Sequence, residues 1–290
     1  MHKSGFVNII GNPNVGKSTL MNALVGEKLS IITSKAQTTR HRIMGIVSGE
    51  DFQIVYSDTP GILKPSYKLQ ESMMKFVTGA VSDADVILYV TDTVERSDRS
   101  AEIIERISRS GIPTIVVINK IDLSTPEALV DKWQAEIPGA QVVPTSAKET
   151  FNIEGLFRTI LSLLPEGPAF YPKDTLTDKT LRFFASEIIR EKILKFYDKE
   201  IPYCCEIEIE SYKEEPTIDR IAATIYVARD SQKGILIGHK GEKLKKVGQT
   251  AREDMEQFLG KKVFLQLFVK VSDDWRNNER QLRRFGYEQE

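Results

Sequence analysis

The sequence predicts an α/β protein in which a doubly wound parallel sheet is followed by a smaller α+β domain. In the first half, apolar strand-like runs alternate with helical stretches, as in parallel sheets covered by helices on both faces. A proline-dense stretch at 165–172 then interrupts the pattern, and a different order of elements follows. We therefore expect domains at 1–164 and 181–290, with a linker at 165–180.

Composition fits soluble globular domains. Of 290 residues, 41% are hydrophobic and 28% are charged, with a formal net charge of −1. Because the net charge is near zero, a nucleic-acid-binding surface must be a local basic patch. Cys204 and Cys205, adjacent in an expected strand, offer neither a disulfide framework nor zinc spacing. No apolar run approaches the roughly 20 residues of a membrane span and no signal peptide is recognisable, so we expect a cytoplasmic protein.

The elements of the first domain follow from apolar periodicity. The expected strands are Phe6–Ile10, Ile43–Val47, Phe52–Ser57, Asp85–Val90, Thr114–Ile118 and Gln141–Pro144, with the second and third forming a hairpin. The expected helices are Ser18–Gly26, Lys68–Ala80, Arg99–Ser110, Pro126–Glu136 and Glu154–Leu164. In such a sheet, ligands bind at the carboxyl ends of the strands.

The first strand ends in a phosphate-binding loop. The motif G-x-x-x-x-G-K-[ST] is matched by Gly11, Asn12, Pro13, Asn14, Val15, Gly16, Lys17 and Ser18, and the helix continues through Thr19. Glycine lets the backbone approach phosphate oxygens, and N–H groups at the helix N-terminus point toward the anion. We expect Lys17 to reach the β- and γ-phosphates and Ser18 to ligate Mg²⁺.

A D-x-x-G motif follows the third strand. Its residues are Asp58, Thr59, Pro60 and Gly61. Asp58 can hold Mg²⁺, and the Gly61 N–H can contact a γ-phosphate. This tetrad is a weak signal by itself, but here it follows a phosphate loop in the order that the chemistry requires.

The segment Ser30–Arg42 carries a candidate metal ligand. We expect Thr39, with Thr38 as the alternative, to ligate Mg²⁺ only when the γ-phosphate is present. Such ligation couples the nucleotide state to the order of the segment. The neighbouring Arg40, His41 and Arg42 are expected to be surface charges, candidates for contact with RNA or a partner, without a catalytic role.

The base is expected to be guanine. Asp122 can accept hydrogen bonds from the N1–H and the exocyclic amine of guanine, a donor pair that adenine lacks. In the same N-K-I-D tetrad, Lys120 can lie along the purine face and Asn119 can brace the loop. The last strand leads into Ser146, Ala147 and Lys148, and the Ala147 N–H is placed to read guanine O6.

The second domain has another pattern. A helix at Leu181–Tyr197 precedes strands at Tyr203–Tyr212 and Arg220–Arg229, helical sequence surrounds a G-x-x-G turn, and Val263–Val271 is a third strand. This order resembles the type II KH domain, whose G-x-x-G turn clamps about four nucleotides of single-stranded RNA. The expected RNA-binding residues are Ile237, Gly238, His239, Lys240, Gly241, Lys243, Lys245 and Arg252. The tail at 273–287 is either a capping helix or a further RNA contact.

Taken together, these motifs resemble the Era family of bacterial GTPases along essentially the whole chain. The resemblance rests on G-N-P-N-V-G-K-S, Q-T-T-R-H, D-T-P-G, N-K-I-D and S-A-K, followed by the KH domain. It implies a GTPase switch, alternating between GTP and GDP, that binds the 3′ end of 16S ribosomal RNA during assembly of the small ribosomal subunit. It also implies a cytoplasmic protein, expected to be a monomer, that can associate peripherally with the inner membrane.

Hydrolysis is assigned to Lys17, Thr39, Gly61 and Asn14, with Mg²⁺ as cofactor. Ile62 stands where Ras-type GTPases have a water-orienting Gln, so slow intrinsic hydrolysis is expected. Asn14 matches an Asn that coordinates K⁺ in potassium-stimulated relatives, which makes K⁺ a second candidate cofactor. Three alternatives are a GTPase supporting RNA modification, a constitutive RNA-binding scaffold, and a signalling switch that binds no nucleic acid.

Overall fold

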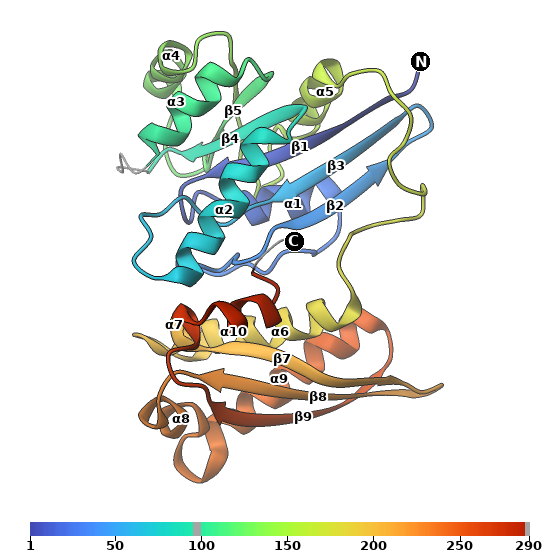
Figure 1. Cartoon of the computed structure of the whole chain (residues 1–290). Coiled ribbons are helices and arrows are strands. Elements are labelled where there is room, and N and C mark those ends of the chain that lie inside the picture. The colour runs from blue at the N-terminus through green and yellow to red at the C-terminus, as the bar shows by residue number, and fades with distance from the viewer. Residues whose placement is uncertain (95–99, 288–290) are drawn as a thin grey trace. The chain divides into compact units, whose positions relative to one another are not determined.

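The computed structural model describes residues 1–94 and 100–287, which divide into two compact units. The first unit comprises Met1–Ser66 and Gln70–Asp178, and the second comprises Tyr67–Leu69 and Lys179–Glu290. One unit contains a six-stranded sheet and the other a three-stranded sheet, which confirms the predicted fold class (Figure 1). Within the described part of the chain, no helix is both long and apolar enough to cross a membrane.

The sheet of the first unit has the order β2-β3-β1-β4-β5-β6. Its strands are β1 (Lys3–Gly11), β2 (Ile43–Ser48), β3 (Phe52–Asp58), β4 (Val86–Asp92), β5 (Thr114–Asn119) and β6 (Gln141–Pro144). All neighbours pair in parallel except β2, which forms the expected antiparallel hairpin with β3. The parallel register brings the carboxyl ends of β1, β3, β4 and β5 to one edge, where the motifs lie.

Helices cover both faces of this sheet (Figure 1). They are α1 (Lys17–Val25), α2 (Lys68–Ser82), α3 (Ala101–Ser110), α4 (Glu127–Glu136) and α5 (Ile153–Leu163). One apolar core joins α2, α3 and α4 to the strands through side chains such as Val77, Ile104 and Trp133. The expected first residue of α3, Arg99, lies outside the described residues.

Most of the expected linker at 165–180, namely residues 165–178, belongs to the first unit. The Gln53 side chain accepts hydrogen bonds from the N–H groups of Phe170 and Tyr171, at 2.7 and 2.9 Å, and donates to the Tyr171 carbonyl. Thr177 donates to the Met44 carbonyl on the edge strand β2. A buried glutamine and an open strand edge therefore hold the segment.

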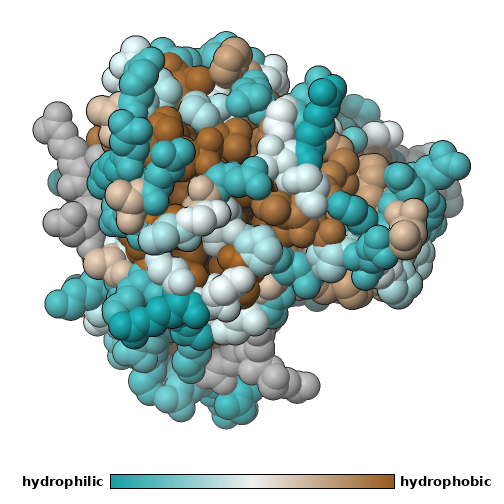
Figure 2. Space-filling model, turned by 90° about the horizontal axis from the view of Figure 1, so that it is seen from above, coloured by the Kyte–Doolittle hydropathy of each residue, from teal (hydrophilic) through white to brown (hydrophobic). Residues whose placement is uncertain are grey.

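On the face of the molecule seen in Figure 2, apolar residues reach the surface between polar ones.

The second unit is an α+β domain with the sheet order β7-β8-β9. Its elements are α6 (Leu181–Phe196), α7 (Ile201–Cys204), β7 (Glu206–Glu214), β8 (Ile218–Val227), α8 (Asp230–Ile237), α9 (Glu242–Leu259), β9 (Lys262–Val271) and α10 (Glu279–Arg284). Strand β8 pairs antiparallel with β7 and parallel with β9. Apolar residues of α6, α8 and α9 form a core with one face of the sheet.

In this unit one sequence expectation is wrong, and the structure favours one of the two alternatives for the tail. A strand beginning at Tyr203 is wrong, because Ile201–Cys204 form a short helix with Pro202 in its first turn. Both cysteines are buried, and the Cys204 carbonyl accepts a 2.9 Å hydrogen bond from the indole of Trp275. The tail therefore caps this unit: Trp275 is fully buried, and the Tyr287 hydroxyl donates to Glu206 at 2.6 Å.

Candidate nucleotide site and nucleic-acid interface

The phosphate-binding loop joins β1 to α1. Gly16 adopts φ 97°, and a Cβ at this position would lie 2.2 Å from the Asn119 side-chain nitrogen, so only glycine fits. Lys17 is 6% exposed, and its ammonium group donates to the carbonyl oxygens of Gly11 and Asn12 at 3.0 and 2.8 Å. The loop thus places a buried positive charge where phosphates are expected to bind.

Three side-chain oxygens meet beside this loop. The Ser18 hydroxyl lies 2.7 Å from Asp58 Oδ2 and 2.9 Å from Thr39 Oγ1, and Thr39 lies 3.3 Å from the same carboxylate oxygen. Asp58 is fully buried, and its other oxygen, Oδ1, has no hydrogen-bond partner among the described residues. Hydroxyl and carboxylate oxygens are the ligands that Mg²⁺ prefers, so this cluster fits the ion.

Burial raises the pKa of Asp58 above its ordinary value. The hydroxyls of Ser18, Ser30 and Thr39 and the positive charge of Lys17 act in the opposite direction, but burial is the larger effect. A divalent cation at this carboxylate would compensate for the lost hydration of its charge.

The structure distinguishes the two threonines. Thr38 Oγ1 lies 2.6 Å from the Lys35 carbonyl and 2.6 Å from the Thr33 hydroxyl, so it serves the local turn. Thr39 is the one beside Ser18 and Asp58, and it is 8% exposed. This geometry favours Thr39 as the metal ligand.

The D-x-x-G loop is held against β1 and the phosphate loop. The buried Thr59 hydroxyl donates to the Ile9 carbonyl at 2.7 Å, and the Ile62 N–H donates to Gly11 at 3.1 Å. A Cβ on Gly61 would lie 2.8 Å from Pro13 Cα. Thr59 and the buried Pro60 therefore have supporting positions, whereas Gly61 lines the cavity. Ile62 is 3% exposed and packs in the core.

The expected base-binding residues are tied to the phosphate loop. Asn119 donates to the Val15 carbonyl and accepts from the Ala147 N–H, each at 2.9 Å. Lys120, at φ 59°, donates to the Asn14 carbonyl. Because Ala147 N–H already serves Asn119, reading guanine O6 through it requires sharing or exchange of that bond.

The specificity carboxylate is held by its neighbour. The Ser146 hydroxyl donates to Asp122 at 2.6 Å, which orients one carboxylate oxygen. Asp122 and Lys148 are both exposed, and Lys148 pairs with Glu149. An oriented, accessible carboxylate is the arrangement that guanine recognition requires.

Sequence reasoning missed Asp92. This residue ends β4, is 6% exposed, and its carboxylate accepts a 2.6 Å bond from Lys120. It thereby fixes the lysine that is expected to lie on the purine. Its position at the carboxyl end of an apolar strand, beside the ends of β1 and β5, was the available signal.

Most of the predicted phosphate-end residues surround one cavity. Its volume is about 370 Å³, within the range of small-molecule sites. The predicted residues that line it are Pro13, Asn14, Gly16, Lys17, Ser18, Thr19, Thr39, Gly61 and Lys120, and the alternative metal ligand Thr38 lines it too. Sequence reasoning assigned no ligand contact to Ile31, Ile32 or Gln37, which also line it. The predicted residues that lie outside its lining are Gly11, Asn12, Val15, Asp58, Thr59, Pro60, Asn119, Asp122 and residues 146–148.

The expectation that Arg40 and Arg42 are surface charges is wrong. Arg40 is fully buried and Arg42 is 7% exposed. Arg42 pairs with Asp83, which lies 41 positions away in sequence, so local composition could not reveal the burial.

The G-x-x-G turn joins α8 to α9. Gly238 adopts φ 74° and ψ −179°, a region essentially reserved for glycine, and Lys240 and Gly241 also have positive φ. His239 and Lys240 are exposed at this turn. The backbone therefore presents a compact and accessible turn of the kind that clamps a nucleic-acid backbone.

A groove begins at this turn and follows α9. Its volume is about 410 Å³, and Gly241, Lys245 and Arg252 line it opposite Leu265 and Leu267 of β9. Lys243 instead lies over the Tyr197 ring, 5.7 Å from its centre, and Ile237 ends α8 half-buried. Arg252 pairs with Glu256 at 2.9 Å. An apolar floor with cationic edges suits unstacked bases and phosphates.

Known proteins share both halves of the chain. Residues 6–120 match the family described as 50S ribosome-binding GTPase, and residues 200–276 match the KH domain. GTPase Era of Staphylococcus haemolyticus is 46% identical over 291 residues, which cover 99% of this chain and 97% of that protein.

Solved structures agree with this relationship. A crystal structure of Era in complex with MgGDPNP and nucleotides 1506-1542 of 16S ribosomal RNA matches with a TM-score of 0.95 and 41% identity, covering 100% of both chains. A variant of Aquifex aeolicus Era bound to GDP·AlF₄⁻ also gives 0.95 and 41%, covering 99% of this chain and 100% of that one.

Fold and site together define a GTP-hydrolysing enzyme of the P-loop class that carries an RNA-binding KH domain. The chain belongs to the Era family of GTPases.

Proposed function

We propose that this GTPase is a switch whose KH domain binds the 3′ end of 16S ribosomal RNA during assembly of the small ribosomal subunit. The observation that carries the proposal is the co-occurrence of two sites: a cavity lined by the buried Lys17 and by Ser18 and Thr39 of the oxygen cluster, and a glycine turn that opens onto a groove. The related Era structure, which contains MgGDPNP and a 16S ribosomal RNA fragment, supports it.

In the proposed reaction, water attacks the γ-phosphate of GTP to give GDP and phosphate. The loop Gly11–Ser18 holds the phosphates, and Lys17 stabilises the charge that develops on the transferred group. The Gly61 N–H contacts the γ-phosphate. Asn119, Lys120 and Asp122 select guanine.

Ser18, Thr39 and Asp58 are proposed to hold Mg²⁺. When bound, the ion neutralises charge on the β- and γ-phosphate oxygens. The close approach of the three side chains and the unpaired, buried Asp58 Oδ1 support this assignment. The MgGDPNP in the related Era structure is consistent with it.

K⁺ is proposed as a second ion, beside Asn14. The Asn14 side chain is exposed at the cavity while its carbonyl accepts from Lys120. The buried Ile62 cannot orient water, and a cation near the phosphates would add to the positive charge that Lys17 supplies there. If Asn14→Asp hydrolyses GTP at the wild-type rate in both potassium and sodium buffers, this assignment is wrong.

A monomeric protein in the cytoplasm, with peripheral association at the inner membrane, is the proposed setting. The family resemblance is its basis, together with two buried cysteines whose adjacent positions offer no disulfide framework, which suits a reducing compartment. Sedimentation of the purified chain would test whether it is a monomer. Its partition onto anionic vesicles would test the peripheral association with the membrane.

RNA binding is tested with a short single-stranded RNA from the 16S 3′ end. Lys240→Asp in the exposed turn should weaken binding at least tenfold, because it reverses a charge beside the clamped phosphates. Lys213→Asp makes the same charge change on the exposed end of β7 and serves as the control. Equal loss in both variants, or loss in neither, would contradict a clamp at the turn. If the wild-type protein binds the RNA with the same affinity in GDP and in a GTP analogue, the result would favour the constitutive scaffold instead.

A further inference from the structure

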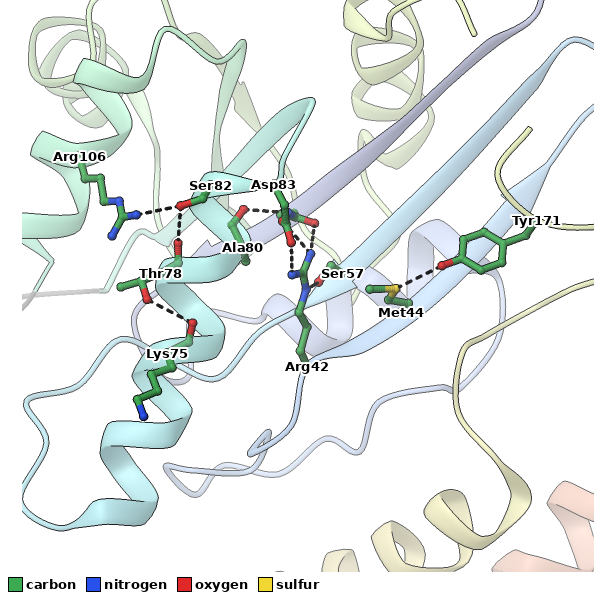
Figure 3. Close-up of polar contacts among 11 residues, drawn as sticks. Arg42, Met44, Ser57, Lys75, Thr78, Ala80, Ser82, Asp83, Arg106 and Tyr171 are labelled. Atoms are coloured by element: carbon green, nitrogen blue, oxygen red, sulfur yellow. Dashed lines mark hydrogen bonds and ion pairs between the residues drawn. The ribbon is translucent and has the colours of Figure 1, made fainter. Parts of the chain in front are cut away.

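Arg42 lies at the end of the segment that carries Thr39, and its buried guanidinium is bonded to three other elements (Figure 3). Its Nε donates to the Ser57 hydroxyl of β3 at 2.5 Å. Its two terminal nitrogens donate to the Asp83 carboxylate at 2.6 and 3.0 Å, just beyond the end of α2. One of them also donates to Asn8 of β1 at 3.1 Å. We call Asn8, Arg42, Ser57 and Asp83 the Arg42 clasp.

Asn8 closes the clasp from the other side. This residue is fully buried, and its amide nitrogen donates to the Asp83 carboxylate and to the Ala80 carbonyl, both at 2.7 Å. The end of α2 is therefore bound to β1 and to Arg42 at once. Asp83 is 53% exposed on its outer side, whereas the guanidinium is not.

Three members of the clasp are close in sequence to residues of the nucleotide site, Asn8 preceding Gly11 by three residues, and the fourth, Asp83, follows helix α2. Arg42 follows Thr39 by three residues, Ser57 directly precedes Asp58, and α2 is the helix after Gly61. A second contact reinforces the link, because the ring of His41 lies 6.2 Å from that of Phe76 in α2. The two segments that are proposed to meet the γ-phosphate and the metal ion are thus joined to each other through the clasp and this contact.

We propose that Arg42 is a positioning residue: through the clasp it holds Thr39 beside Ser18 and Asp58 and fixes the end of the adjoining helix α2. This inference deepens the proposed function and rests on it. It explains why a residue expected at the surface is buried with a partner 41 positions away. It also assigns a role to Asp83 and Asn8, which no motif contains.

The chemistry explains why arginine occupies this position. Its planar guanidinium donates hydrogen bonds to both oxygens of a carboxylate, to a hydroxyl and to an amide oxygen at the same time. A lysine ammonium group on a flexible side chain cannot reproduce this geometry. Removing Asp83 would leave a buried guanidinium without its counter-charge. The segment 39–42 would then relax toward water, and Thr39 would leave the oxygen cluster.

The experiment compares affinities of the full chain for GDP and for a non-hydrolysable GTP analogue in Mg²⁺. Asp83→Asn keeps the side-chain shape at a half-exposed position and should fold. It should weaken analogue binding about tenfold and GDP binding less than about twofold, because only the analogue engages Thr39 through the γ-phosphate. Arg42→Gln should act in the same direction. The double variant should bind the analogue no more than about twofold more weakly than the weaker-binding single variant, because both substitutions remove the same interaction.

Ser82→Ala is the matched control. Ser82 ends the same helix, and its hydroxyl accepts from Arg106 at 2.8 Å and donates to the Thr78 carbonyl at 3.1 Å, neither of which belongs to the clasp (Figure 3). Its analogue-to-GDP affinity ratio should equal that of the wild type. A clasp with only a structural role would weaken both nucleotides by the same factor in Asp83→Asn, and that result overturns the proposal.

Hydrogen exchange of the nucleotide-free protein separates failure of the inference from failure of the proposed function. Amides of residues 39–43 should exchange at least about fivefold faster in Asp83→Asn than in Ser82→Ala. Unchanged exchange overturns the clasp even if nucleotide binding is normal. If exchange is faster in Asp83→Asn but the wild-type protein binds the analogue and GDP equally, the clasp anchors this segment. The proposed switch is then rejected, together with the claim that the clasp affects analogue binding.

Discussion

The nucleotide site and the RNA-binding turn are built in opposite ways. Lys17, Thr39 and Asp58 are buried and bonded to one another or to strand ends, so their positions depend on side-chain contacts from several elements. At the G-x-x-G turn, His239 and Lys240 are exposed, and the conformation comes from positive φ angles at 238, 240 and 241. The first site should therefore be sensitive to small side-chain changes, and the second to changes of backbone freedom and charge.

The largest effect should come from Lys17→Ala. This change removes a buried ammonium group from the phosphate loop, and GTP hydrolysis should fall roughly 100- to 1000-fold because its charge is no longer available to the transition state. Lys132→Ala on the exposed surface of α4 is the control. Single-turnover hydrolysis measures the difference. Residual activity within about tenfold of the wild type would show that Lys17 does not face the phosphates.

Asp122→Asn should change the base that the protein selects. The substitution loses an ionised acceptor for two guanine donors, each worth about 1.5 kcal/mol or more, so GTP affinity should fall roughly 100-fold. Xanthosine triphosphate, which presents an acceptor in place of the exocyclic amine, should bind more tightly than to the wild type. Competition binding with the two nucleotides gives the result. If Asp122→Asn prefers GTP over xanthosine triphosphate as strongly as the wild type does, Asp122 does not contact the guanine base.

A backbone change should affect only the RNA site. Gly238→Ala is strained at φ 74° and ψ −179° and should weaken RNA binding about tenfold by reshaping the turn. Gly260→Ala, at φ 63° beyond the other end of α9, has a comparable positive φ and is the control. Fluorescence anisotropy with a short RNA distinguishes them. Equal losses would mean that the effect comes from general destabilisation of α9.

The smallest expected effect is that of Asp58→Asn on thermal stability. This substitution should stabilise the metal-free protein although it impairs nucleotide binding. Because burial raises the pKa of Asp58, its ionised form at neutral pH opposes folding of the metal-free protein. Asp58→Asn should therefore raise the thermal midpoint of the metal-free protein by a few degrees, at about 2–4 °C per kcal/mol recovered. The same variant should lose Mg²⁺-dependent GTP binding. A lower midpoint would show that the ionised carboxylate stabilises the loop.

The same contrast explains what the sequence could predict. Lys17, Asp58 and the N-K-I-D tetrad follow strands whose carboxyl ends meet at one sheet edge, so local motifs and the rule for parallel sheets locate them. The turn at 238–241 is likewise local. The fold class and the GTPase and KH assignments are confirmed on this basis.

The remaining features depend on residues far apart in sequence. Arg42 is buried because of Asp83 and Asn8, and Lys120 is fixed by Asp92. No periodicity connects these positions. The strand expected from Tyr203 fails for a related reason, because the tail residue Trp275 bonds to Cys204 and stabilises a helical turn there.

The most direct test of the central claim is the affinity of the wild-type chain for the 16S 3′-end RNA, measured with GDP and with a non-hydrolysable GTP analogue. A switch predicts a difference of about fivefold or more between the two. By thermodynamic reciprocity, the RNA must then change the analogue-to-GDP affinity ratio by the same factor. A ratio of one in both measurements would contradict the switch and leave two independent binding sites on one chain.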